Sequence, residues 1–190
     1  MNKIIAVLAI MAVSFPLYAA TTPEEVALRY FEAFKKGDPV SVADSMHPDE
    51  IYKLKNQLLP LLKRVEQIDE QVVDLEIQAL RQLMGASDAS TLEEESARDF
   101  FIRFTRWVIL RNPELNKAMA DAVMKPVGHV VDGDIAYVVG KVDVTVMGTP
   151  ISQMKVMTAR KSDDGWLMTL TDEVEGVIRI MQRRFGRAGM

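Results

Sequence analysis

The sequence predicts an α+β fold in which N-terminal helices pack on a curved, cone-like antiparallel sheet. Apolar residues follow helical spacing through the first two thirds of the chain, and the period changes to two at about residue 128. Turn signals then divide the remainder into strands, with Asp132-Gly133-Asp134 the strongest hairpin signal. Helices followed by consecutive strands are typical of this class. We expect an enlarged helical segment at about 50–125, between the first helices and the sheet.

The first 20 residues, "MNKIIAVLAIMAVSFPLYAA", have the pattern of a secretory signal peptide. Lys3 precedes an apolar run, and small residues close it, so we expect cleavage near Ala19-Ala20 and a periplasmic protein of one domain, 21–190. The run is shorter than the about 20 residues of a membrane-spanning helix. With no cysteine for a lipid anchor, we expect no stable attachment to the membrane. A net charge of −4 provides no general attraction to nucleic acid.

Start and stop signals define the first helices. Thr22 and Glu25 form a predicted capping box, and Gly37 is a typical left-handed helix end. Asp38-Pro39 and His47-Pro48 repeat the combination of a capping residue and a proline, which predicts two further helix starts.

The segment from Ile51 to about Met84 predicts a long helix with one apolar seam. Pro60 should kink or split this helix. We expect the seam to pack, within one chain, on the Phe100–Trp107 face of a helix capped by Ser90 and Thr91. A short helix should run from Asn112 to about Met124. Steps of three and four residues define the seam, which comprises Ile51, Leu54, Leu58, Leu61, Val65, Ile68, Val72, Leu75 and Ala79.

The longest predicted strand begins at Ile135 and has two distinct faces. Its even-numbered positions are apolar, whereas the odd-numbered positions include Tyr137, Lys141 and Asp143. A clean alternation indicates that the apolar face lies inward. Gly140 predicts a bulge or bend within the strand. Further strands are expected at 151–161 and 166–171, and a final helix from Asp172.

Two stretches resemble the nuclear transport factor 2-like superfamily, in particular its exported bacterial members. They are "EEVALRYFEAFKKGDPVSVADSMHPDE" and "SDDGWLMTL", and the resemblance covers residues 22–50 and about 127–171. It implies a cone in which the first helices lie inside a curved sheet. The superfamily includes ketosteroid isomerases, polyketide cyclases, dehydratases and non-catalytic binding proteins. The fold therefore does not select between catalysis and binding.

His47 and Asp143 are the two candidate acid–base residues. His47 is interpreted chiefly as a helix cap before Pro48. Asp143 would have a raised pKa and could abstract protons if its face of the strand were concave and buried. On an outward face it would instead be a solvated neighbour of Lys141.

Metal and cofactor sites are not expected. His129 has no ligand-type residue close in sequence, and the chain has two histidines and no cysteine, which argues against zinc. Met154 and Met157 lie three positions apart in a strand and so should point to opposite faces, which argues against copper.

The resulting hypothesis is a non-enzymatic domain that binds a small apolar ligand or a protein partner. One alternative is an isomerase, cyclase or dehydratase that uses Asp143 or His47. Another is a helical inhibitor or immunity-type protein acting through residues 50–125. The expected ligand pocket lies inside the cone and is lined by Tyr30, Phe31, Phe34, Val142 and Met157.

Overall fold

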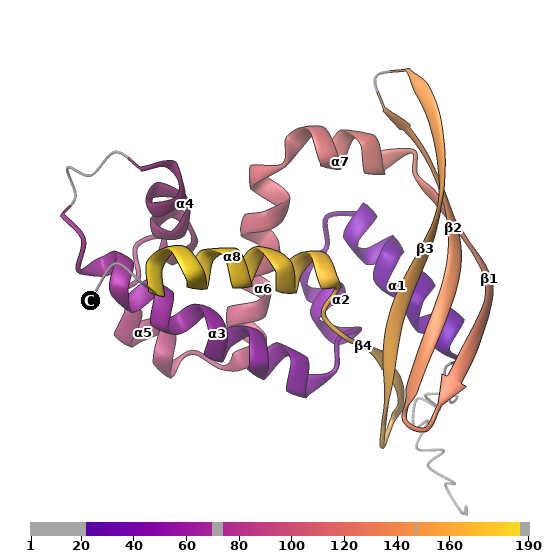
Figure 1. Cartoon of the computed structure of the whole chain (residues 1–190), viewed down its shortest axis with the longest axis horizontal. Coiled ribbons are helices and arrows are strands. Elements are labelled where there is room, and N and C mark those ends of the chain that lie inside the picture. Colours follow the sequence, from indigo (N-terminus) through magenta and orange to yellow (C-terminus); the bar gives the residue numbers. More distant parts are fainter. Residues whose placement is uncertain (1–21, 70–73, 147, 187–190) are drawn as a thin grey trace, which may run out of the picture.

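The computed structural model describes residues 22–69, 74–146 and 148–186, and it confirms the predicted α+β class (Figure 1). The expected signal peptide and Val72 lie outside the described residues. The described elements, in chain order, are α1 (Pro23–Lys35), α2 (Pro39–Asp44), α3 (Pro48–Glu66), α4 (Leu75–Met84), α5 (Ala89–Glu94), α6 (Ala97–Arg111), α7 (Pro113–Ala120), β1 (Val123–Asp132), β2 (Ile135–Val146), β3 (Thr149–Ser162), β4 (Gly165–Met168) and α8 (Asp172–Gly186).

Helix α1 is capped as predicted and lies against the sheet. The Thr22 Oγ1 accepts a hydrogen bond from the Glu25 amide at 3.2 Å, and the Glu25 carboxylate accepts one from the Thr22 amide at 2.9 Å. Val26 and Ala27 are fully buried, and α1 contacts all four strands. The strands arch over this helix in Figure 1. The N-terminal helix and the C-terminal sheet therefore share one core.

The sheet is antiparallel with strand order β1-β2-β3-β4, and the predicted inward face of β2 is confirmed. Ala136 and Val138 are fully buried, whereas Tyr137 is exposed on the opposite face. Of the bulge or bend expected at Gly140, the bulge lies in the partner strand β1, where the register shifts between Pro126 and Gly128, opposite Gly140 and Val139.

Gly140 has a different structural role from the one predicted. A Cβ atom at this position would lie 2.7 Å from the terminal methyl carbon of Met124. Met124 is itself buried, in β1. The glycine therefore permits a close approach between a side chain and the neighbouring backbone.

The junction of α2 and α3 is attached to the last strand. The His47 amide donates to the Met168 carbonyl, and the Met168 amide donates to the Ser45 carbonyl, both at 2.8 Å. Met46 and Met168 form an isolated parallel bridge. On β3, strand β4 pairs only with the stretch from Ala159 to Ser162. The start of α3 is thereby positioned against the end of the sheet.

Helix α3 continues through Pro60 to Glu66, so the proline does not split the helix. Pro60 is exposed, so a backbone carbonyl that loses its helical partner there can be hydrated. The break comes later, before α4. Leu75 then falls in the first turn of a separate helix and is 78% exposed, so its assignment to the buried seam was wrong.

The single helix predicted to begin at Ser90 and Thr91 is instead two helices, α5 and α6. Asp88 caps α5 by accepting the Thr91 amide at 2.7 Å, and Ser96 caps α6, so the predicted cap at Ser90 and Thr91 was wrong. Helix α7 ends at Ala120, and β1 begins before residue 128. Aspartate is as favourable as serine at the N-cap, so α5 begins after Asp88 and not after Ser90.

The expected packing of the seam within one chain is confirmed. Helices α3 and α4 both contact α6. The Trp107 indole N–H donates to the Ala79 carbonyl at 3.0 Å. Leu54, Leu58 and Val65 are at most 1% exposed.

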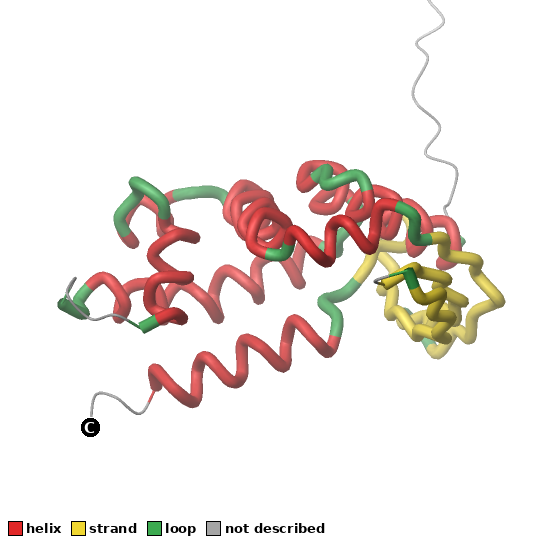
Figure 2. The backbone as a smooth tube through the Cα atoms, turned by 90° about the horizontal axis from the view of Figure 1, so that it is seen from above, coloured by secondary structure: helices red, strands yellow, loops and turns green. Residues whose placement is uncertain are grey.

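The helical part extends away from the sheet, and α8 runs along it (Figure 2). Within the described part of the chain, the contacts of α8 fall mainly on α3. None of the described helices combines the length and the apolar character needed to cross a membrane.

Candidate functional site

His47 lies at the first turn of α3, where it is the N-cap. Its Nδ1 accepts the Asp49 amide at 3.2 Å, and its Nε2 lies 3.3 Å from the Arg160 Nε. A neutral imidazole has one acceptor nitrogen, so only one of these contacts can be a full hydrogen bond. The side chain is buried, and burial together with the nearby Arg160 cation lowers the pKa of His47. This environment stabilises a neutral capping residue.

Asp143 lies on the outward face of β2. Its carboxylate accepts a hydrogen bond from the Ser152 hydroxyl at 2.5 Å and lies 3.3 Å from the Lys141 ammonium. These two partners lower its pKa, with Ser152 the larger influence. The hollow it helps to line, about 250 Å³ in volume, is shallow and contains Asp121 but no histidine. A general base would need the opposite shift in pKa.

His129 joins the first helix to the first strand. Its Nδ1 lies 2.5 Å from a Glu24 carboxylate oxygen, and this hydrogen bond lowers the pKa of Glu24. Within the described ranges, no three histidine, aspartate or glutamate side chains are grouped to hold a metal ion. Met154 is exposed and Met157 is partly buried, on opposite faces of β3.

The five residues expected to line a pocket inside the cone do not come together around one described cavity. Phe31 belongs to the core. Tyr30 and Phe34 face α6 and the segment leading into α8, where they line a cavity of only about 50 Å³. Val142 and Met157 are partly buried on β2 and β3 and do not line it.

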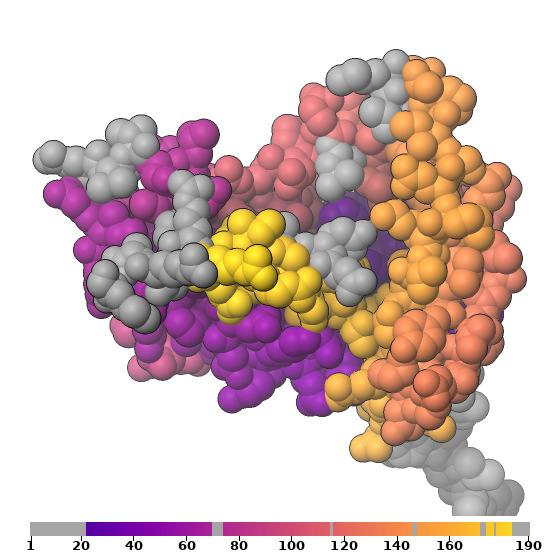
Figure 3. All heavy atoms as spheres, in the orientation of Figure 1, coloured from indigo at the N-terminus to yellow at the C-terminus, as the bar shows by residue number. Residues whose placement is uncertain are grey.

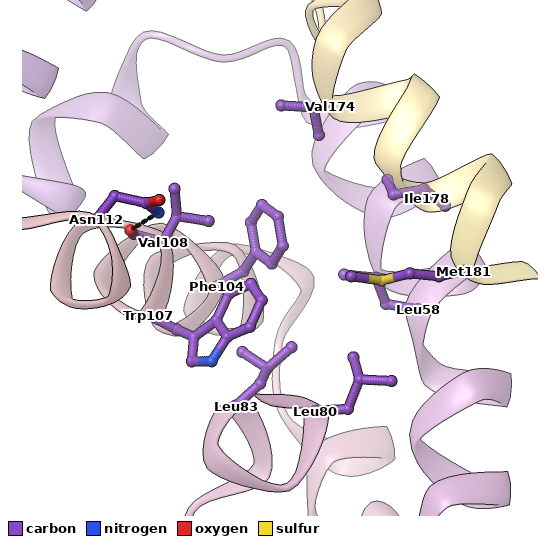
Figure 4. Close-up of a pocket in the computed structure, with 10 residues that line it drawn as sticks. All are labelled: Leu58, Leu80, Leu83, Phe104, Trp107, Val108, Asn112, Val174, Ile178 and Met181. Carbon is purple, nitrogen blue, oxygen red and sulfur yellow. Dashed lines mark hydrogen bonds between the residues drawn. The ribbon is translucent and has the colours of Figure 1, made fainter. Parts of the chain in front are cut away.

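A larger cavity lies in the helical part, between α3, α4, α6 and α8 (Figure 4). Its volume is about 390 Å³, within the range of small-molecule sites. None of the described side chains that line it is titratable. The lining residues are Leu58, Leu80, Leu83, Phe104, Trp107, Val108, Asn112, Val174, Ile178 and Met181.

The wall of this cavity combines rigid and adaptable groups. Leu80, Leu83 and Ile178 are at most 2% exposed, so the surrounding core fixes them. The rings of Phe104 and Trp107 are 5.8 Å apart and form the α6 side. Met181 contributes a flexible side chain from α8, which can adapt to ligands of different shape.

The side-chain N–H donors at the wall already have partners. The Asn112 amide donates to the Val108 carbonyl at 2.7 Å, and the Trp107 indole N–H is bonded to the Ala79 carbonyl. The cavity can therefore bury apolar surface but has few groups that could orient a reacting substrate.

An ion pair fixes the beginning of α8. The Lys53 ammonium lies 2.5 Å from the Glu175 carboxylate, which raises the pKa of Lys53 and lowers that of Glu175. Because α8 packs mainly on α3 among the described residues, a space remains between α8 and α6. The space-filling view in Figure 3 shows α8 lying across α3 on this face of the molecule.

The sequence pattern indicates the two apolar helix faces that border this cavity but not the cavity itself. The α6 face and the residues Val174, Ile178 and Met181 follow helical spacing, which indicates burial in either case. Whether two such faces meet fully or leave a gap depends on the angle and spacing of the helices. No residue pattern in the chain specifies these quantities.

The chain was also compared with known proteins. No family model, no curated protein and no solved structure matches it.

Proposed function

We propose that the protein is a non-enzymatic, periplasmic binding protein for a small apolar molecule, which occupies the cavity between α6 and α8. The observation that carries this proposal is a cavity of about 390 Å³ with apolar walls from four helices. Burial of apolar surface contributes about 25 cal/mol per Å², which is sufficient for reversible binding without a strong polar anchor.

The positions of the two acid–base candidates support binding over catalysis. His47 caps a helix and contacts Arg160, and Asp143 lies on the outward face of the sheet. Neither lines the large cavity. An isomerase or dehydratase would need such a group within hydrogen-bonding reach of its substrate.

Trp107 provides a direct test because it lines the cavity, and the chain has only one other tryptophan, Trp166. In a Trp166→Phe background, titration with N-phenylnaphthylamine, an uncharged apolar dye, should quench Trp107 emission and saturate. A matched pair of variants then locates the dye. Met181→Trp should fill the cavity and weaken dye binding at least about tenfold, which corresponds to about 1.4 kcal/mol.

The control is Ile180→Trp, because Ile180 is adjacent on α8 but 63% exposed. It should leave the dye fluorescence titration unchanged. Equal dye affinities in the two variants, with unchanged melting temperatures, would show that the dye does not occupy this cavity.

A further inference from the structure

A second hollow lies beside the cavity, on α4 and α6. Its volume is about 350 Å³. Leu83 and Trp107 line both spaces, so the cavity and the hollow adjoin at these two side chains. In Figure 4 they lie together at one end of the apolar cavity. The other residues lining the hollow are Gln82, Gly85, Arg103, Arg106, Leu110 and Arg111.

Three guanidinium groups line this hollow, and two of them have no acidic partner among the described residues. Arg103 is paired with Glu95 through two hydrogen bonds of 3.2 Å. Arg106 and Arg111 make no ion pair with any carboxylate in the described part of the chain. In a chain of net charge −4, this is a local excess of positive charge.

Arg111 is held in a defined orientation. Its guanidinium lies 5.4 Å from the centre of the Trp107 ring and donates to the Gln82 Oε1 at 3.2 Å. A guanidinium stacked on an aromatic ring keeps donors at its edge, and its planar fork matches a carboxylate or a phosphate. Leu110 is 73% exposed beside it and adds apolar surface.

We propose that this arginine hollow binds the anionic head of an amphiphile whose apolar chain lies in the adjacent cavity. The inference rests on the proposed function, because it assigns the ligand of the same site to a chemical class. The cavity supplies apolar surface without charge, and the hollow supplies charge beside it. A carboxylate or phosphate head on a flexible chain satisfies both.

Three probes with the same chain test the head group: dodecanoate, dodecyl phosphate and dodecanol, each below its micellar concentration. We expect the two anions to bind at least about tenfold more tightly than the alcohol, because hydrogen bonds to charged groups are among the strongest. Added salt should reduce this ratio, since the arginines are near the surface.

Variants of the hollow test which residues produce this ratio. The double variant Arg106→Gln/Arg111→Gln should bring the ratio of anion to alcohol affinity close to one, whereas Arg106→Lys should retain most of it. Arg98→Gln is the control, because Arg98 lies on the same helix but pairs with Asp44.

The outcomes separate the two proposals. If none of the three probes binds, the proposed function is wrong. If dodecanol binds as tightly as the anions, or if the double variant keeps the full ratio, the cavity remains a binding site but the arginine hollow does not hold the head. Inorganic phosphate should compete with dodecyl phosphate at high concentration. Phosphate binding without competition would show two independent sites and would overturn this inference.

Discussion

At the scale of single residues, His47 shows how a residue type associated with catalysis can serve the fold. Its backbone amide donates a hydrogen bond to the Met168 carbonyl, and its Nδ1 accepts the Asp49 amide at the start of α3. Its Nε2 lies beside the Arg160 guanidinium. Each contact fixes the junction of helices and sheet. Protonation would remove the acceptor that caps the helix and would place a second positive charge beside Arg160.

This environment predicts a pH dependence of stability. The pKa of His47 is lowered in the folded state, whereas an unfolded histidine titrates near about 6.5. The unfolded chain therefore takes up the proton first. The contribution of neutral His47 to the free energy of unfolding should be complete above about pH 6.5 and should decrease as the pH falls below this value.

Urea unfolding on both sides of that pH measures the effect. His47→Asn keeps a capping oxygen without the titration, so the variant should lose less stability than the parent on acidification. His129→Asn controls for the other histidine. Identical losses in the parent and in His47→Asn would contradict the assignment.

Gly140 gives a second prediction at this scale. Gly140→Ala should destabilise the fold by about 1 kcal/mol, the low end of the range for overpacking, because the new Cβ meets the terminal methyl of the buried but flexible Met124 side chain. In a Met124→Ala background the same substitution should cost less. A double-mutant cycle measures this coupling, and purely additive effects would show that Met124 is not the cause.

At the scale of elements, α3 is the central support of the helical part. It contacts α4, α5, α6 and α8. One face of it serves both the core and the cavity, because Leu58 is almost fully buried and also lines the cavity wall. The stability of the helices and the shape of the binding site therefore depend on the same side chains.

Leu58→Ala should lower the free energy of unfolding by about 2–5 kcal/mol, the usual cost for a buried leucine. The apparent molecular mass in solution should stay the same, because the seam packs within one chain. Thermal unfolding and light scattering measure the two quantities. Tyr52→Ala, at a residue 61% exposed on the same helix, is the control. Loss of a dimer without loss of stability would indicate an intermolecular seam.

At the scale of the whole molecule, local signals predicted the elements better than their assembly. The caps at Thr22, Asp38 and His47 and the inward face of β2 depend on neighbouring residues and were predicted. The helix break before α4 was misplaced because proline at an exposed position is tolerated, and Leu75 was consequently placed in the wrong register.

The candidate site was harder to predict than the fold. Tyr30 and Phe34 were assigned to the sheet side, but they face α6 and the approach to α8. An apolar side chain in a helical stripe indicates burial without specifying its partner. The large cavity results from how α8 lies relative to α6, which is a property of tertiary packing.

The contact of α1 with every strand has a consequence for the order of events in folding. The N-terminal helix leaves the ribosome first, yet the surface that buries Val26 and Ala27 includes strands made only from Val123 onward. Contacts this distant in sequence slow folding. A chain ending at residue 164 would also lack the Met168 bonds to the α2–α3 junction. It should remain sensitive to protease, whereas the full chain becomes resistant. The core should therefore close only after the last strand has been synthesised.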